Sequence, residues 1–313
     1  MQLSIIIVSY NTRDILLDCL RSVRDSQLQL SYEVIVVDNA STDGSPQMVE
    51  REFPDVLLIK NSVNLMFAKA NNQAMRIAKG DYFLLLNSDC IVEPGNIEKL
   101  YDFIRARQAK VACVGPRVLS QDGSFQSEGN PFDGLGFVLG VLFSPFVLPL
   151  PASVKERLLP KGFPRILRGK CRRVGWISGC CMLISRSVIT AVGMLDENLF
   201  FYHEETDFCL RARQEGFETW VYPDAYITHL GSASMAPNGS IRTDERVAAT
   251  RLYFLDKFYH RGYWVVVCLL KLFTFVPLML LSRLLNQRAI VRAFHAQIRL
   301  ANSDLKLMLG SYA

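Results

Sequence analysis

The sequence predicts an α/β domain with a mostly parallel central sheet, and three observations lead to that prediction. Over residues 1–120, apolar runs typical of buried strands alternate with segments whose apolar residues recur at helical spacing. The strand-like runs are apolar almost throughout, as strands are when helices cover both faces of their sheet. Polar residues follow several of these runs directly, which is where ligands bind in open sheets of this kind. Residues 1–120 are therefore expected to fold as repeated strand–helix units.

The elements of this alternation can be assigned in chain order. Five strands are expected, at residues 3–10, 32–41, 56–61, 81–89 and 111–119. Helices are expected between them, at residues 13–23, 68–80 and 94–107. The first of these helices carries its apolar residues on one face, and the last begins with a proline, which suits the first turn of a helix.

A similar texture returns after residue 171. Residues 172–186 resume the strand–helix pattern, and an acidic segment at 200–216 enters a helix that a glycine ends. Short strands are expected at 217–223 and 225–231, and a long helix at about 243–260. The second half is therefore expected to complete the same α/β domain.

Two segments in the middle of the chain differ in composition. Residues 134–154 carry no charge over 21 positions, but their three prolines argue against a spanning helix. A loop that dips into a surface or covers a substrate fits them better. Between Lys155 and Arg173, eight Lys and Arg stand against one Glu. That excess suits an anionic membrane surface, a diphosphate group or a solvated loop.

The C-terminal segments also favour contact with a membrane. Residues 263–281 are apolar apart from Lys271, and residues 287–309 form a basic amphipathic helix typical of an interfacial element. A lysine near the centre of a spanning helix costs about 2.5–3.5 kcal/mol. We therefore favour attachment to one membrane surface, while a single span or a helix pair docked on the catalytic domain stays open.

Bulk composition limits the function classes. The chain has 313 residues, a net charge of +5 and a mean hydropathy of +0.16, so charge alone gives no reason to expect nucleic acid. Its eight cysteines form no CxxC pair, which favours reduced, buried thiols of a cytosolic protein over disulfides or a zinc site. The opening "MQLSIIIVSYN" has no basic leader and is expected to be the first strand, not a signal peptide.

Two carboxylates stand at the tips of expected strands. Asp38 ends the second strand and could accept hydrogen bonds from a base or a ribose. Asp89 ends the fourth strand and could bind a hard cation through oxygen. A diphosphate would explain the pair, because a metal held by Asp89 would offset the phosphate charge. Taken alone, an aspartate in a turn is more often a cap or part of an Asx-turn.

Five blocks in order carry a resemblance to a known family. They are "SIIIVSYNTRDILLDCLRSV", "VIVVDNASTDGS", "NSVNLMFAKANNQAM", "GDYFLLLNSDCIVEPG" and "FFYHEETDFCLRARQEG". Together, over residues 3–235, they resemble the family 2 glycosyltransferases with the GT-A fold, in particular the rhamnosyltransferase-like bacterial branch. The resemblance implies a Rossmann-like nucleotide-diphospho-sugar transferase fold with a mostly parallel central sheet.

On the donor side, the resemblance implies binding of a nucleotide-diphosphate sugar. Asp38 matches the family's nucleotide-contacting aspartate, and Ser9, Tyr10 and Asn11 lie in its first nucleotide-side loop. The donor is expected to be dTDP-rhamnose, from the branch, or a UDP-hexose.

The metal motif of the family falls on Asn87, Ser88 and Asp89. The first position is Asn where the family pattern has Asp, so only Asp89 can be an anionic ligand; Asn87 and Ser88 are expected on the nucleotide-sugar side. His229 falls where some relatives place a metal-contacting histidine, although a lone histidine is often structural. The expected cofactor is a divalent cation, Mg²⁺ or Mn²⁺.

On the acceptor side, Glu204 and Glu205 match the family's acidic pair, whose second member is the expected general base. The pair is usually Glu-Asp, so the choice between the two glutamates stays open. Asp207 is either an acceptor-side residue or a helix-opening carboxylate. The block that lines the acceptor side contains three further residues, Trp176, Ser178 and Gly179.

The resemblance implies an inverting, metal-dependent glycosyltransferase of cell-wall or polysaccharide biosynthesis. It would move one sugar, rhamnose or a similar hexose, to a hydroxyl of a lipid-linked saccharide at the inner face of the cell membrane, and no nucleic acid is expected to bind. Domain boundaries follow the blocks: a GT-A catalytic domain at 1–240, with a nucleotide-sugar half at 1–120, a loop region at 121–173 and an acceptor half at 174–240, then a helical, membrane-associating extension at 241–313.

Several alternatives can be compared from the residues. An oxidoreductase needs G-x-G-x-x-G after the first strand, where this chain has "SYNTRDI", and no GxxxxGK[ST] occurs either. Processive synthases carry a Q-x-x-R-W element, but Arg precedes none of the three tryptophans. A polyprenyl-phosphate sugar synthase of the same fold and a non-catalytic membrane-bound sugar-nucleotide-binding scaffold remain as alternatives.

Overall fold

The computed structural model describes most of the first two thirds of the chain and one long helix near its end. The described ranges are 1–107, 109–127, 170–200, 202–231 and 261–284, with isolated positions between 250 and 305. The uncharged stretch 134–154, most of the basic stretch 155–173, most of the helix expected at 243–260 and most of the amphipathic helix expected at 287–309 lie outside the described residues.

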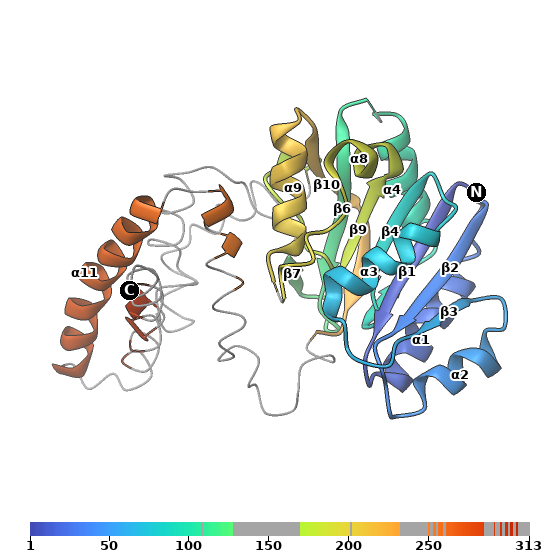
Figure 1. The fold of residues 1–313 in the computed structure, drawn as a ribbon, viewed down its shortest axis with the longest axis horizontal. Coiled ribbons are helices and arrows are strands. Elements are labelled where there is room, and N and C mark those ends of the chain that lie inside the picture. The colour runs from blue at the N-terminus through green and yellow to red at the C-terminus, as the bar shows by residue number, and fades with distance from the viewer. Residues whose placement is uncertain are drawn as a thin grey trace. The chain divides into compact units, whose positions relative to one another are not determined.

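The described strands and helices alternate along the chain (Figure 1). The strands are β1 (Leu3–Ser9), β2 (Tyr32–Asp38), β3 (Leu57–Lys60), β4 (Tyr82–Asn87), β5 (Cys90–Val92), β6 (Val111–Leu119), β7 (Phe125–Ser127), β8 (Arg172–Val174), β9 (Cys181–Ser185) and β10 (Glu218–His229). The helices are α1 (Arg13–Asp25), α2 (Ser45–Glu52), α3 (Met66–Ile77), α4 (Asn96–Arg105), α8 (Arg186–Val192), α9 (Glu204–Gln214) and α11 (Arg261–Leu284).

The strands form one sheet in the order β3-β2-β1-β4-β9-β6-β10-β5, with β7 paired to β6 and β8 to β10. Strands β3, β2, β1 and β4 pair in parallel, and so do β6 and β10. Strand β9 runs antiparallel between β4 and β6, and β5 pairs antiparallel with β10. Six of the eight strands in this order thus point one way, which confirms the expected α/β fold with a mostly parallel sheet.

The core lies on both faces of the sheet because side chains alternate along each strand. In β1, Ile5 and Ile7 pack on one face with α1, α2 and α4, while Ile6 packs on the other with α3, α8 and α9. Leu84 and Phe83 in β4 divide in the same way. All five side chains are buried, which explains why the strands are apolar almost throughout.

Several elements differ from the expected ones. Helix α2 and the antiparallel strand β9 were not assigned from the sequence. The two strands expected at 217–223 and 225–231 are one strand, β10, whose register shifts between Tyr222 and Tyr226. Pro223 lies in that interval and has no N–H to donate to the ladder, so an irregularity there is the physical result.

Helix α11 belongs to a second compact unit, separate from the unit that holds the sheet. The 24-residue helix contains Pro277. Cys268 and Phe275 are buried, whereas five large apolar side chains are exposed: Val266, Leu269, Leu270, Phe273 and Leu280. Among the described residues, no helix combines the length and apolarity that a membrane crossing requires.

Candidate functional site

The candidate site begins where three parallel strands end together. Register pairs Ser9 at the end of β1 with Asp38 at the end of β2, and Val8 with Asn87 at the end of β4. The backbone N–H of Asn39 donates to the carbonyl of Ser9 at 2.9 Å, so the two neighbouring tips stay joined beyond the ladder. The polar residues expected from the sequence at these strand tips therefore share one edge of the sheet.

Asp38 is held as a buried acceptor at this edge. The residue is 2% exposed, and its Oδ2 accepts a hydrogen bond from the backbone N–H of Ser41 at 2.9 Å. Its Oδ1 has no hydrogen-bond partner among the described residues. Because a buried carboxylate oxygen without a donor costs free energy, Asp38 suits a ligand that brings N–H or O–H groups.

The loop after β1 is tied to the loop after β2. Asn11 adopts a left-handed backbone (φ 52°), which asparagine tolerates better than most residues. Its N–H donates to Oγ of Ser41 at 2.9 Å, and the N–H of Thr42 donates to Oδ1 of Asn11 at 2.8 Å. Tyr10 stands exposed before this turn. Asn11 thus fixes the loop around Asp38, and Tyr10 is left to face solvent or a ligand.

A chain of hydroxyls links this loop to the turn that contains Asp89. Oγ of Ser9 lies 2.9 Å from Oγ1 of Thr12, which lies 3.2 Å from Oγ of Ser88. All three residues are buried. Ser88 therefore holds the turn between β4 and β5 in place, and Thr12, which the sequence reasoning did not single out, completes the link.

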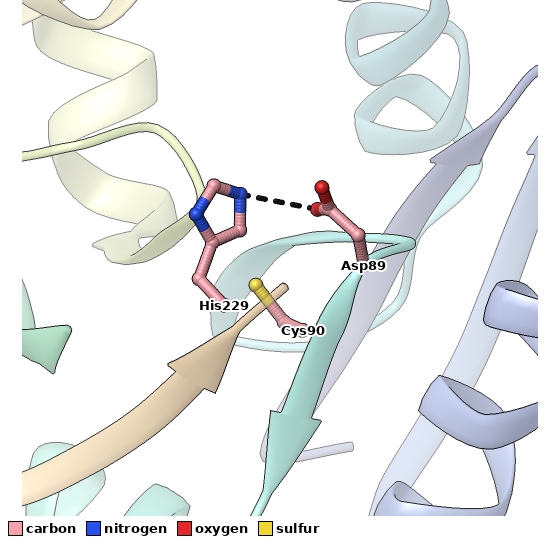
Figure 2. A group of neighbouring side chains, drawn as sticks. All are labelled: Asp89, Cys90 and His229. Carbon is pink, nitrogen blue, oxygen red and sulfur yellow. Dashed lines mark ion pairs between the residues drawn. The ribbon is translucent and has the colours of Figure 1, made fainter. Parts of the chain in front are cut away.

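Asp89 and His229 are brought together by strand register. Asp89 stands directly before β5, and β5 pairs antiparallel with β10 so that His229 is opposite Cys90. The backbone N–H of Leu230 donates to the carbonyl of Asp89 at 2.9 Å. As a result Nε2 of His229 lies 3.1 Å from Oδ1 of Asp89. The dashed line in Figure 2 marks this pair.

The surroundings of this pair determine what it can hold. Nδ1 of His229 lies 2.7 Å from Oε1 of Gln126 in β7. If Nδ1–H donates to that oxygen, a neutral ring presents the lone pair of Nε2 to the Asp89 carboxylate. Oδ1 of Asp89 is buried and accepts no well-aligned hydrogen bond from the described residues. Two such electron-rich atoms repel each other unless a proton or a cation lies between them.

The pKa of His229 agrees with this description. Burial lowers it, but the hydrogen-bonding and charge effects of Asp89 and the Cys180 thiol raise it, with a net value above the usual range. The ring thus responds to a local excess of negative charge. A divalent cation would satisfy the same demand, and the carboxylate and the imidazole are both ligands that such cations accept.

A thiol completes the group. Sγ of Cys90, an oxygen of Asp89 and a ring nitrogen of His229 all lie within 4.8 Å of one another. Cys90 is fully buried, and its Sγ donates to the carbonyl of Cys180 at 3.3 Å. The three residues fit a divalent cation by their donor types and their spacing, as the converging side chains of Figure 2 illustrate.

The segment expected on the acceptor side contacts both the metal motif and α9. The N–H of Asn87 donates to the carbonyl of Cys180 at 2.8 Å, and Oγ of Ser178 lies 3.2 Å from Sγ of Cys180. A methyl group in place of the Gly179 hydrogen would lie 3.7 Å from Cβ of Glu205. This segment therefore connects the tip of β4 with the first turn of α9.

Glu204 and Glu205 begin α9, and both have raised pKa values. Burial raises the pKa of Glu204 to about 8, with a further contribution from the charge of Glu205, and burial raises the pKa of Glu205 to about 7. Glu204 is 3% exposed, and its Oε1 has no hydrogen-bond partner among the described residues. Glu205 is less fully covered. A carboxylate with a pKa near neutrality suits proton transfer.

The remaining expected residues have contacts of their own. Asp207 is buried and accepts a hydrogen bond at Oδ2 from Nε of Arg211 at 2.7 Å. The guanidinium of Arg211 also donates to the carbonyls of Val192 and Met194, so it joins α9 to the end of α8 and to the segment that follows. Trp176 is partly buried and packs against the core on the α9 face of the sheet. These contacts stabilise the frame around Glu205.

The structure groups the expected residues into neighbouring clusters. Ser9, Asn11, Asp38 and Ser88 form the hydrogen-bonded loops at the strand tips, while Asp89 and His229 meet beside them. Gly179 and Glu205 adjoin. Four contributors were not singled out from sequence: Thr12, Cys90, Gln126 and Phe67, whose ring would lie 3.5 Å from a methyl group at Gly179. Cys90 could have been noticed next to Asp89, whereas neither Gln126 nor Phe67 carries any local signal.

The chain is similar in sequence to known proteins. Residues 4–193 match the family model described as Glycosyl transferase family 2. The N-acetylglucosaminyl-diphospho-decaprenol L-rhamnosyltransferase of Mycobacterium tuberculosis is 29% identical over 247 residues, which are 74% of this chain and 76% of that protein.

Solved structures share the fold. The mannosyltransferase PcManGT from Pyrobaculum calidifontis, in complex with GDP-Man and Mn²⁺, superposes with a TM-score of 0.55 at 14% identity, covering 99% of this chain and 75% of that one. GalNAc-T7 with UDP, GalNAc and Mn²⁺ superposes with a TM-score of 0.53 at 16% identity, and the match covers 73% of this chain and 44% of that one. These likenesses establish a GT-A-like fold.

Proposed function

The chain belongs to glycosyl transferase family 2, and from that premise we propose that it is an inverting, metal-dependent enzyme that transfers one sugar from a nucleotide-diphosphate donor to a lipid-linked saccharide. The single observation that carries the proposal is the pair of Asp89 and His229 at the carboxyl edge of the sheet. Its position matches the place where open α/β sheets bind ligands. Membership in the family establishes a sugar transferase and disfavours a non-catalytic scaffold.

The donor occupies the edge formed by β1, β2 and β4. The free oxygen of Asp38 accepts from the base or the ribose, and the loop fixed by Asn11 closes that end of the site. Asn87 and Ser88 contact the sugar-diphosphate side. Solved structures of the same fold contain GDP-Man and UDP, which supports a nucleoside-diphosphate donor for this chain.

Asp89 and His229 would hold a divalent cation, Mn²⁺ or Mg²⁺. When bound, such a cation stabilises the negative charge of the diphosphate leaving group. The protein contributes a buried carboxylate and an imidazole whose orientation Gln126 sets. Both comparison structures contain Mn²⁺, which supports this choice of cofactor.

Glu205 acts as the general base. With a pKa of about 7, the partly buried Glu205 is deprotonated in a large share of molecules at neutral pH. Its carboxylate is also basic enough to take the proton of a hydroxyl. Glu204 is nearly inaccessible, and its pKa of about 8 keeps it mainly protonated at pH 7. Attack by an activated hydroxyl from the face opposite the leaving group inverts the anomeric carbon, without a nucleophile from the enzyme.

The M. tuberculosis relative supports a choice of substrates, since its name specifies a rhamnosyl group and an N-acetylglucosaminyl-diphospho-decaprenol acceptor. We propose dTDP-rhamnose as donor, with a UDP-hexose as the second candidate, and a polyprenyl-diphosphate saccharide as acceptor. The polyprenyl-phosphate sugar synthase reading is less favoured, since the relative named here transfers to a saccharide already carried by the lipid.

We further propose that α11 attaches the protein to the inner face of the cell membrane. Its exposed apolar residues lie on one face, because positions 266, 269, 270, 273 and 280 fall within about 100° of arc at 3.6 residues per turn. The buried residues Cys268 and Phe275 lie opposite. A monotopic attachment of this kind suits a lipid-linked acceptor. The catalytic domain would then span residues 1–240 and the membrane-associating extension residues 241–313.

A transfer assay tests the proposed function. Purified protein is incubated with a polyprenyl-diphosphate N-acetylglucosamine, Mn²⁺ and a panel of nucleotide sugars, and the product is identified by mass spectrometry. Nuclear magnetic resonance of the product then gives its anomeric configuration. One donor should yield a disaccharide of inverted configuration; a retained configuration, or no transfer from any donor, would contradict the proposal.

A further inference from the structure

The backbone on either side of Cys90 holds its side chain close to Asp89 and His229. It follows Asp89 directly, and antiparallel pairing sets its backbone opposite His229. The residue is 0% exposed. The two strands therefore fix Cys90 and His229, while Asp89 lies in the turn directly before β5 and is tied to the end of β10 by the hydrogen bond from the N–H of Leu230 (Figure 2).

Among the described residues, the thiol of Cys90 bonds to both the carbonyl and the thiol of Cys180. Its Sγ donates to the carbonyl of Cys180 at 3.3 Å, and the carbonyl also accepts from the N–H of Asn87. If the thiol lost its proton, the carbonyl of Cys180 would still accept a hydrogen bond from the N–H of Asn87. Cys90 can thus change partner without stranding a buried polar group.

We propose that Cys90 is a third donor of this site, so that the site prefers a thiophilic divalent cation such as Zn²⁺ over Mg²⁺. This inference rests on the proposed function, because it concerns the metal of the same site. One carboxylate, one imidazole and one thiolate form a mixed set that suits Zn²⁺ or Co²⁺, whereas Mg²⁺ demands oxygen ligands in an octahedron. Asn87 and Ser88 carry no charge, so Asp89 is the one carboxylate of this turn.

The distances agree with such a site. Bond lengths of about 2.0–2.3 Å at tetrahedral angles place neighbouring donor atoms roughly 3.3–3.8 Å apart. Oδ1 of Asp89 and Nε2 of His229 lie 3.1 Å apart, and the donor atoms of all three residues lie within 4.8 Å of one another. Small side-chain movements would complete the coordination.

The binding step is a simple exchange. Zn²⁺ forms a bond to Sγ of Cys90, and the thiol proton leaves to solvent, with no change in oxidation state. Three protein ligands then leave one position of a tetrahedron for a diphosphate oxygen. Mn²⁺ or Mg²⁺ held by Asp89 and His229 alone would keep more positions open to the donor. Zn²⁺ is therefore expected to displace the catalytic ion and to inhibit transfer.

Cobalt spectroscopy tests the assignment without any substrate. All proteins carry Cys171→Ser, because Cys171 is the exposed cysteine and could bind cations by itself. Co²⁺ should give a thiolate-to-cobalt charge-transfer band in this parent, and Cys90→Ser should abolish the band. The control Cys181→Ser, a neighbouring buried cysteine outside the donor group, should retain it. Absence of the band from the parent, or its survival in Cys90→Ser, would overturn the proposal.

Titration with Zn²⁺ against a chromophoric chelator gives the magnitude. Cys90→Ser should weaken Zn²⁺ binding at least tenfold, since even residues that contact only the ligands of a metal change its affinity by about 10–100-fold. The same substitution should change the dissociation constant of Mn²⁺ by less than about threefold. Equal losses for both ions would overturn the selectivity. If Cys90→Ser fails to fold, X-ray absorption of the zinc-loaded parent decides: one sulfur with nitrogen and oxygen neighbours supports the site, and any other sulfur number contradicts it.

These outcomes separate the inference from the proposed function. A charge-transfer band that requires Cys90, in a protein that transfers no sugar, would uphold the cysteine ligand and refute the enzyme assignment. Transfer supported by Mn²⁺ in a protein without the band would do the reverse.

Discussion

Replacement of Glu205 by Gln removes the proposed base with little change of shape. The carboxylate stands in the first turn of α9, with its Cβ beside the backbone of Gly179. General bases contribute about 10²–10⁴-fold to rate, which corresponds to roughly 3–5 kcal/mol of activation free energy. We expect kcat to fall by that factor, while the dissociation constant of the donor changes less than about twofold, because Glu205 belongs to the acceptor side.

The pH dependence gives a second, independent result. Burial raises the pKa of Glu205 to about 7, and the base must be deprotonated to act. In the wild type, kcat should therefore rise with pH and level off above about 7. Glu204 and Glu205 interact, so the inflection belongs to the pair. In Glu205→Gln the residual rate should lose this inflection.

A transfer assay with a radiolabelled donor or with mass-spectrometric detection, run from pH 5.5 to 9, gives both kcat and its pH dependence. Glu215→Gln is the matched control, since Glu215 lies exposed at the other end of α9 and should leave kcat unchanged. A loss below tenfold, or an unaltered pH profile, would refute Glu205 as the base.

Three further changes test other parts of the account. Glu204→Gln should stabilise the protein at pH 9 but not at pH 4, as thermal melts at both pH values would show. The pKa of Glu204 in the folded protein, about 8, lies above its unfolded value, so the wild type loses stability as pH rises from about 4.5 through 8. Gln126→Leu removes the acceptor for Nδ1 of His229 and should weaken Mn²⁺ binding by about 10–100-fold in calorimetry, with the fold unchanged by circular dichroism; unchanged affinity would remove Gln126 from the site. Phe273→Glu, at a side chain that is 81% exposed, should reduce cosedimentation with anionic vesicles while Tm stays constant, and equal cosedimentation would argue against α11 as the anchor.

Local pattern was sufficient for most of the first half of the fold, although α2 and β5 were missed. Residues 1–120 alternate between strand-like and helix-like periodicity, and each strand tip could be located from where the apolar run stops. The sequence alone therefore predicts that Asp38 and Asp89 lie at the same edge of the sheet. The resemblance carried by five sequence blocks added Glu204, Glu205 and His229.

Long-range pairing explains what the sequence did not reveal. The insertion of β9 between β4 and β6 joins strands almost 100 residues apart, and an apolar run is compatible with either direction. The approach of His229 to Asp89 depends on the β5–β10 register, which a shift of one residue would reverse. Gln126, on a three-residue strand, becomes informative only once that register is known.

Metal-dependent donor binding tests the central claim most directly. Thermal melts of the wild type and Asp89→Ala are compared with each nucleotide sugar, in Mn²⁺, in Mg²⁺ and in chelator. The account predicts that one nucleotide sugar raises Tm of the wild type only when a metal is present, and that Asp89→Ala, folded but lacking the carboxylate, shows no such shift. A shift that persists in chelator or in Asp89→Ala would contradict the claim that Asp89 holds the metal that holds the diphosphate.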